Sequence, residues 1–242
     1  MNIAVIFAGG SGQRMHTRDI PKQFLEMHGK PIIIYTLEIF EKHPNIDAVV
    51  VACKKEWIDY LNNLLYKYRV EKVKKIVPGG ETGQMSIFNG LVAASEVSGG
   101  EDAVVLIHDG VRPLINAKVI SDNISSVKKH GSAITTAVVK ETILVVNDEE
   151  AIVSVPDRAH SRVAKAPQSF WLNDILEAHR RAQNEGMTDC IDSCTLMKGY
   201  GYPLFLVDGP YENIKITTPD DFYTMRALID AKENEQFFQE GE

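Results

Sequence analysis

The sequence predicts an α/β fold built on a doubly wound, mostly parallel, Rossmann-like sheet. Short apolar runs rich in valine and isoleucine recur along the first half of the chain without polar alternation. Such runs are typical of parallel strands that are covered on both faces. Stretches with helical spacing separate them, and a strand–helix repeat of this kind places helices on both faces of one sheet.

Each element of the first half follows from a local pattern. The expected strands are the continuous apolar runs Ile3–Ala8, Ala48–Cys53, Val73–Val77 and Ala103–His108. Between them, apolar side chains recur at the spacing of an amphipathic helix. The expected helices are Pro31–His43, Lys55–Tyr68, Met85–Ser95 and about Ala117–Lys129.

The pattern changes after Gly131. Three strand-like runs then stand close together: Ser132–Val139, Thr142–Val146 and Ala151–Val155. The polar turn Asn147–Glu150 separates the last two, as in a hairpin. We therefore expect a β-hairpin arm at about residues 140–160, inserted into one domain that spans residues 1–242. Because arms of this kind often join subunits, we expect a homodimer.

The chain after the arm returns to mixed elements. We expect helices at Leu172–Asn184, at Ser193–Lys198 and from about Pro219, with strands at Leu204–Val207 and Ile214–Thr217. The last helix has a strong start signal, since Thr218 can act as its cap, Pro219 occupies its first position and two aspartates follow.

Composition and charge exclude several classes of function. The formal net charge of −7 argues against a broad basic surface for nucleic acid. No stretch approaches the ~20 apolar residues that cross a bilayer, and the N-terminal apolar run lacks the basic flank of a signal peptide. The three cysteines follow no zinc-ligand spacing. We expect a cytoplasmic protein with reduced thiols whose partners are small molecules.

A glycine-rich segment, Ala8–Met15, directly follows the first strand. Its small residues let the backbone approach a ligand, and their N–H groups can point at anionic oxygens. A dinucleotide-binding loop would need a glycine where Arg14 stands and an acidic residue after the second strand, where Lys54 stands. The Gly-Lys of a P-loop is also absent. Two cations near the loop, Arg14 and Lys22, suit a triphosphate better than a dinucleotide, which disfavours a dehydrogenase.

The segment Ala8–Met15, followed by Pro21–Leu25 (Pro-Lys-Gln-Phe-Leu), resembles the signature of sugar-phosphate nucleotidylyltransferases. More narrowly, it resembles the cytidylyltransferases for methylerythritol phosphate and for ribitol phosphate, and the resemblance extends over essentially the whole chain. It implies a magnesium-dependent enzyme that joins the CMP part of CTP to a polyol phosphate and releases pyrophosphate. The implied CTP contacts in the first loop are Ala8, Gly9, Gly10, Ser11 and Gly12.

The segment Gly79–Ile87 is a strand-to-helix turn with hydrogen-bonding groups, which is compatible with a plain helix cap. The family pattern places the cytosine here and implies Gly80, Glu81 and Ser86 as its readers. The implied nucleotide contacts are Gly80, Glu81, Thr82, Gly83, Gln84, Met85 and Ser86. Many relatives carry an arginine where this chain has Gly83, so a contact from that position is weakened.

The segment His108–Pro113 follows another buried strand. Asp109 is well placed to hold Mg²⁺ or a substrate hydroxyl, because Mg²⁺ on a nucleotide takes one or two carboxylates along with phosphate oxygens and waters. The resemblance adds Gly110 as a nucleotide contact. We interpret Arg112 as a brace for the loop and His108 as a structural hydrogen-bonding group.

Three further residues carry the acceptor chemistry in the family pattern. Lys215 lies in an apolar run, where a lysine needs an anionic partner unless the run is an exposed edge strand. Arg158 is otherwise an ordinary surface arginine. The resemblance implies that Lys215 and Arg158 hold the acceptor phosphate, with Thr142 near the polyol, and that Arg158 serves the neighbouring subunit's site if the arm crosses over. The candidate catalytic residues are therefore Arg14, Lys22, Arg158 and Lys215.

The acceptor is the open choice. Gly110-Val111 and Pro156–His160 are closer to the ribitol-phosphate branch, so we rank ribitol 5-phosphate ahead of methylerythritol 4-phosphate. The place where both branches carry a Thr-Asp pair reads Cys190-Ile191-Asp192 here, which predicts an altered acceptor pocket. A non-catalytic nucleotide-binding protein is a distant alternative, disfavoured because all four cations are retained.

Overall fold

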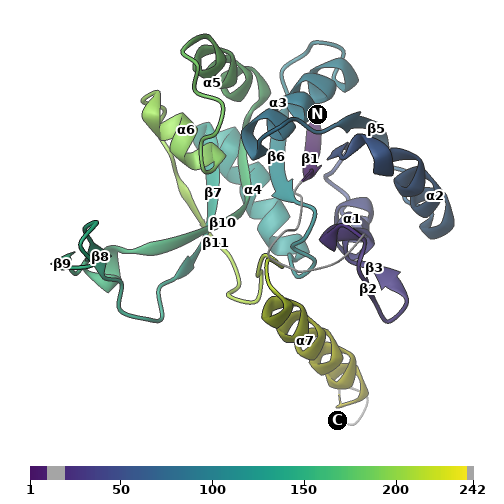
Figure 1. Ribbon diagram of the computed structural model, residues 1–242. Coiled ribbons are helices and arrows are strands. Elements are labelled where there is room, and N and C mark those ends of the chain that lie inside the picture. The colour runs from purple at the N-terminus through teal and green to yellow at the C-terminus, as the bar shows by residue number, and fades with distance from the viewer. Residues whose placement is uncertain (10–19, 239–242) are drawn as a thin grey trace.

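A computed structural model of the protein describes residues 1–9 and 20–238. Its centre is a seven-stranded sheet with helices on both faces (Figure 1). In spatial order the strands are β11 (Leu206–Asp208), β7 (Ser132–Val138), β10 (Arg162–Trp171), β6 (Val104–Asp109), β1 (Asn2–Ala8), β4 (Ala48–Cys53) and β5 (Val73–Pro78). Strand β10 runs antiparallel to both of its neighbours, whereas the other adjacent strands of the sheet pair in parallel. The predicted α/β fold class is confirmed.

The core has two halves because side chains of each strand alternate between the faces of the sheet. Ala4 and Ile6 of β1 pack with α1, α2 and α4 on one face, and Ile3 and Val5 pack with α3, α5 and α6 on the other. These six helices are α1 (Ile32–Lys42), α2 (Ile58–Tyr68), α3 (Gly83–Val97), α4 (Ala117–His130), α5 (Leu172–Asn184) and α6 (Ser193–Gly199). The continuous apolar runs of the sequence therefore reflect burial on both faces.

The C-terminal helix α7 (Pro219–Phe238) extends away from the sheet (Figure 1). Its first half packs Met225 against Met27 and Ile32, beside the small hairpin of β2 (Glu26–Met27) and β3 (Lys30–Pro31). The helix starts as its sequence predicts: the Asp221 carboxylate accepts hydrogen bonds from the backbone N–H groups of Thr217 and Thr218, both at 2.8 Å.

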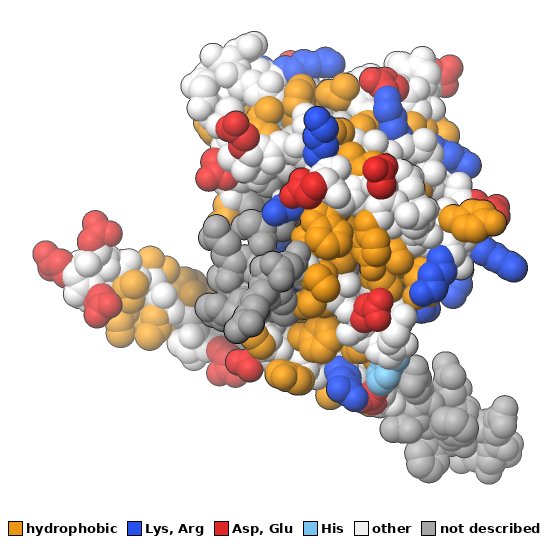
Figure 2. Space-filling view, turned by 45° about the vertical axis from the view of Figure 1, so that its right-hand side comes forward, with side chains coloured by type: hydrophobic (Ala, Val, Ile, Leu, Met, Phe, Trp, Pro, Cys, Tyr) orange, Lys and Arg blue, Asp and Glu red, His pale blue; other side chains and the backbone are white. Residues whose placement is uncertain are grey.

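The arm leaves the sheet between β7 and β10 (Figure 1). Its hairpin is short, with β8 (Val145–Val146) antiparallel to β9 (Ile152–Ser154). Figure 2 shows hydrophobic side chains gathered along the arm behind an acidic tip. The exposed ones include Leu144, Val146, Ile152, Val153 and Val155, each at least half exposed. Within the described residues, no helix is both long and apolar enough to cross a membrane.

Besides the small β2–β3 hairpin, which the sequence did not predict, two segments differ from the sequence-based expectation. The segment Ile214–Thr217 is not a strand; it is irregular, and the Ile216 N–H donates to the carbonyl of Val111, a loop residue. Conversely, β10 (Arg162–Trp171) was not expected, because Lys165 and Pro167 interrupt its apolar run. The register of β10 against β7 shifts between Ala164 and Gln168, which accommodates the proline in the sheet.

Candidate active site

Two cavities open at the carboxyl ends of the parallel strands, where sheets of this type bind ligands. The large cavity, of about 850 Å³, lies against the ends of β1 and β4 and the turn before α3. The small cavity, of about 280 Å³, lies between β6, β10, α5 and α6. The two cavities meet at residues that line both of them: Phe7, Gly83, Asp109 and Lys215.

One wall of the large cavity is made of closely packed backbone. Ser86 holds it in place, since its hydroxyl accepts from the Gly80 N–H at 3.0 Å and donates to the Thr82 carbonyl at 2.9 Å. A Cβ on Gly9 would lie 2.9 Å from Ser86 Oγ, and one on Gly80 would lie 2.4 Å from Met85 Cβ. Only glycine fits at such approaches, so Ser86 and the two glycines shape this wall together.

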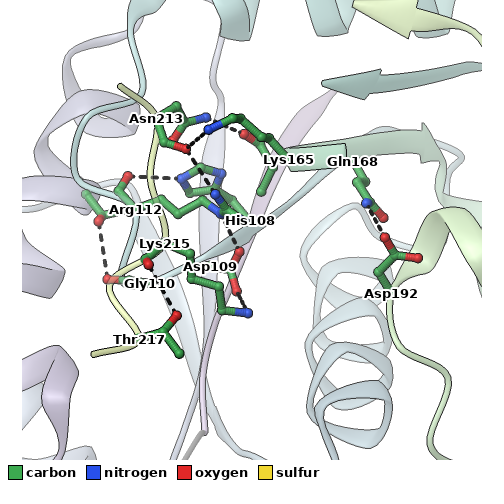
Figure 3. Close-up of polar contacts among 12 residues, drawn as sticks. His108, Asp109, Gly110, Arg112, Lys165, Gln168, Asp192, Asn213, Lys215 and Thr217 are labelled. Carbon is green, nitrogen blue, oxygen red and sulfur yellow. Dashed lines mark hydrogen bonds and ion pairs between the residues drawn. The ribbon is translucent and has the colours of Figure 1, made fainter. Parts of the chain in front are cut away.

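An ion-pair network marks the boundary between the cavities (Figure 3). Lys215 Nζ lies 2.6 Å from Asp109 Oδ1, and Arg112 Nε lies 2.7 Å from Asp109 Oδ2. The Asp109 and Arg112 side chains are 6% and 12% exposed, whereas Lys215 is 42% exposed and reaches into both cavities. Lys215 therefore has the anionic partner that its apolar sequence context requires. Arg112 also donates to the Asn213 carbonyl, so it braces the loop.

The network keeps Asp109 ionised. Burial alone pushes the pKa of its carboxyl upward, but the Lys215 ammonium and the Arg112 guanidinium hold that pKa well below its usual range. His108, beneath the same loop, is fully buried, and this burial lowers its pKa to about 4. His108 is thus neutral near pH 7 and packs as a structural group, in contact with the Arg112 carbonyl at 3.3 Å.

The small cavity has a polar side and an apolar side. Gln168 Nε2 donates to Asp192 Oδ2 at 2.9 Å (Figure 3). Asp192 also caps α6 by accepting from the Thr195 N–H. Opposite them, His179 of α5 lies among apolar side chains, and burial lowers its pKa to about 4. Neither of its ring nitrogens has a hydrogen-bond partner among the described residues.

The structure brings many predicted site residues together at the large cavity: Ala8, Gly9, Lys22, Gly80, Glu81, Thr82, Gly83, Ser86, Asp109 and Lys215. Gln84 instead lines the small cavity, where its amide bonds to the Met187 carbonyl and the Cys190 N–H. Met85 and Gly110 line neither cavity. Four predicted residues lie outside the described part of the chain: Gly10, Ser11, Gly12 and Arg14.

Two predicted acceptor residues lie far along the chain's own arm. Thr142 and Arg158 are exposed, and neither lines a cavity of the same chain. Arg158 Nη1 donates to the Lys140 carbonyl, at 3.3 Å. A single chain therefore does not bring Arg158 to Lys215.

Several residues of the site escaped sequence reasoning. The large cavity also has Lys54, Lys55 and Asp189 in its wall. The small cavity has Lys165, Gln168, His179 and Asp192. Lys165 has the same sequence signal as Lys215, a lysine within an apolar run, and that signal identifies it as a lysine in need of a partner. His179 lies on an otherwise ordinary amphipathic helix and has no local signal.

Comparison with known proteins identifies the family. A family model described as IspD: 2-C-methyl-D-erythritol 4-phosphate cytidylyltransferase matches residues 2–231. The chain belongs to this cytidylyltransferase family. It is therefore a nucleotidyltransferase whose substrates are CTP and a sugar or polyol phosphate.

Within the cytidylyltransferase family, curated relatives with two names match nearly the whole chain. A ribitol-5-phosphate cytidylyltransferase of Streptococcus agalactiae serotype III is 60% identical over 98% of this chain and 99% of its own length. A ribitol-5-phosphate cytidylyltransferase of Vibrio parahaemolyticus is 57% identical over 98% of this chain and 100% of its own length. A 2-C-methyl-D-erythritol 4-phosphate cytidylyltransferase of Clostridium botulinum is 37% identical over 95% of this chain and 97% of its own length.

The fold of this cytidylyltransferase matches solved structures of the family. The crystal structure of 4-diphosphocytidyl-2C-methyl-D-erythritol synthase from Anaerococcus prevotii superposes with a TM-score of 0.81. It is 26% identical in sequence, and the match covers 95% of this chain and 96% of that one. The mixed sheet and the flanking helices are thus shared with enzymes of the family.

Proposed function

We propose that this cytidylyltransferase uses D-ribitol 5-phosphate as its acceptor and forms CDP-ribitol and pyrophosphate from CTP. The observation that carries the choice is the 60% identity, over nearly the full length, to a protein named for that acceptor, against 37% for a protein named for methylerythritol phosphate. The small cavity supports it, because its Gln168–Asp192 pair offers polar groups that suit a chain of hydroxyls.

In the proposed reaction, an oxygen of the acceptor phosphate attacks the α-phosphorus of CTP. The bond from that phosphorus to the bridging oxygen breaks, and pyrophosphate leaves with the electron pair. The large cavity has the room and the glycine-lined wall for CTP, with Lys22 at its edge. Lys215 and Arg112 flank Asp109 where the cavities meet. These three side chains sum to one positive charge, which favours an anionic phosphate there.

Magnesium is proposed as the cofactor, and the residues present fit it. Asp109 is a buried carboxylate that lines both cavities. Each of its oxygens makes one ion pair and keeps a further lone pair. Mg²⁺ bound to a nucleotide needs only one or two such carboxylates. When bound, it would neutralise charge on the phosphates of CTP.

A homodimer through the arm is part of the proposal. The arm exposes a row of large aliphatic side chains (Figure 2), and exposed apolar surface of this extent marks an interaction site. Arg158 and Thr142 lie on the same arm, away from the cavities of their own chain. Docking the arm on a second copy would carry both residues to that copy's acceptor pocket.

Pyrophosphate release, with CTP and Mg²⁺ and each acceptor in turn, tests the proposed reaction. We expect release with ribitol 5-phosphate and a product with the mass of CDP-ribitol. Release with methylerythritol 4-phosphate alone would overturn the proposed acceptor and leave the cytidylyltransferase assignment intact.

A further inference from the structure

The segment that carries Lys215 is not held by a sheet ladder. Residues 211–217 are irregular, and yet Asn213 and Ile216, on either side of Lys215, are fully buried. Backbone without a ladder must be fixed by other hydrogen bonds if a side chain on it is to stay in place. The position of Lys215 therefore depends on the contacts of residues 211–216.

These contacts converge on Asn213 (Figure 3). Lys165 Nζ, from β10, donates to the carbonyls of Tyr211 at 2.9 Å and of Asn213 at 3.1 Å. The Asn213 carbonyl also accepts from Arg112 Nη1 at 3.0 Å. The Asn213 side chain donates through Nδ2 to the Ala166 carbonyl at 2.6 Å. On the other side of Lys215, the Ile216 N–H donates to the Val111 carbonyl at 3.0 Å.

Lys165 is an unusual anchor. It is 8% exposed, and burial, followed by the nearby Arg112 charge, lowers its pKa. Its two hydrogen bonds go to backbone carbonyls and not to a carboxylate. Burial of an ammonium costs stability, and the nearby Glu212 charge opposes the fall in the pKa of Lys165 without reversing it. A hydrogen bond from a charged donor is stronger than one from a neutral group. Burial of Lys165 therefore lowers the stability of the fold, while its hydrogen bonds fix the backbone of residues 211–213.

We propose that Lys165 is a positioning residue: its two hydrogen bonds to the 211–213 backbone set the place of the Lys215 ammonium opposite Asp109. This proposal rests on the proposed function only in its activity readout. Losing the hold lets Lys215 move, and a shift of about 1 Å in such a group can cost about 100-fold in rate.

The test combines activity with hydrogen exchange in the full-length protein. Lys165→Met removes the donors and keeps the stem, and we expect kcat to fall at least about tenfold while KM for CTP stays within about twofold. Lys165→Arg keeps donors in reach and should retain most of kcat. In a Lys215→Met background, Lys165→Met should cause no further loss, because both changes act through one ammonium. A full, multiplicative loss in the double variant would overturn the proposal.

Hydrogen exchange gives a readout that needs no substrate, so it decides the question even if ribitol 5-phosphate proves to be the wrong acceptor. In Lys165→Met, a peptide covering residues 211–217 should exchange faster while peptides from β1 and β4 stay unchanged. The matched control is Lys72→Met, which removes a lysine that also donates to a backbone carbonyl, that of His43 at 2.7 Å, and lines neither cavity. Unchanged exchange of the 211–217 peptide in Lys165→Met would contradict the proposal.

Discussion

Lys215 and Asp109 are 106 residues apart in sequence (215 − 109), and their side chains meet at 2.6 Å between the two cavities. The last residue of a strand and a segment without regular structure form this contact, because Asp109 ends β6 and Lys215 lies in the stretch before α7. Arg112 occupies the second oxygen of the same carboxylate. The pair thus joins the sheet edge to the C-terminal segment and fixes a cation where a phosphate would bind.

Replacing Asp109 by Asn removes the only negative charge of this network. Lys215 and Arg112 would then face each other without a counter-charge, and the loss of one partner from a largely buried pair is destabilising. Because Lys215 is partly exposed, we expect the free energy of unfolding to fall by about 2 kcal/mol. Urea unfolding measures it. Adding Lys215→Met should restore about 1 kcal/mol; a double variant less stable than Asp109→Asn would contradict this reading.

The buried His179 predicts a pH dependence of stability. Burial lowers its pKa to about 4 from an ordinary 6.5, so between these values the unfolded chain binds a proton that the folded chain does not. Stability therefore falls as pH falls from 6.5 towards 4. His179→Phe removes this proton, and the slope of unfolding free energy against pH between about 4.5 and 6 should decrease by about 1.4 kcal/mol per unit. Identical slopes for variant and wild type would refute the assignment.

The arm predicts complementation between inactive variants. If Arg158 serves the partner's site, a dimer of one Arg158→Ala chain and one Lys215→Met chain holds one doubly altered site and one intact site. Equal mixing after co-expression gives mixed dimers in half of the population, so about a quarter of wild-type activity should return. Each variant alone should be nearly inactive. Activity in the mixture no higher than in the separate variants would place Arg158 outside the partner's site.

Two glycines, Gly80 and Gly83, allow a matched test of the backbone wall of the large cavity. A methyl group on Gly80 would collide with Met85, whereas one on Gly83 meets nothing within 4 Å. Gly80→Ala should therefore distort the turn and lower kcat/KM for CTP about 10- to 100-fold. Gly83→Ala should leave that ratio within about twofold and raise stability by about 0.5 kcal/mol, since alanine has less freedom in the unfolded chain. Equal effects of the two changes would show that this wall does not shape the CTP site.

The local sequence pattern was sufficient to predict the strands that are buried on both faces and the amphipathic helices. Strands such as β4 (Ala48–Cys53) and helices such as α5 (Leu172–Asn184) lie where the apolar runs predict them. Strand β10 could not be predicted in the same way, because two of its residues depend on distant parts of the chain. Lys165 donates to the backbone of loop 211–213, and Pro167 lies where the register against β7 shifts. The apolar residues of Ile214–Thr217 predicted a strand that is absent, because Ile216 is buried among side chains of α1, α7 and the Val111 loop and not by pairing in a sheet.

The residues of the candidate site also fall into those with a local sequence signal and those that only the fold brings together. Glycine-rich turns and cations after strands are local signals, and they indicated the wall around Gly80 and the pairing of Lys215 with an anion. The small cavity is assembled from strands, helices and loops distant in sequence, so Asp192 and His179 are brought into the site only by the fold. The Gln84 amide is hydrogen-bonded to the 187–190 loop, a contact that the local sequence around Gln84 does not reveal.

Competition between the two acceptors tests the central claim most directly. CTP and Mg²⁺ are supplied with equal concentrations of ribitol 5-phosphate and methylerythritol 4-phosphate, and the two products are quantified by mass spectrometry at low conversion of both acceptors. The product ratio equals the ratio of the two kcat/KM values. We expect CDP-ribitol to exceed the methylerythritol product at least about 100-fold, because a pocket built for hydroxyls rejects an analogue that leaves its polar groups unpaired. A ratio near one, or in favour of methylerythritol, would contradict the account.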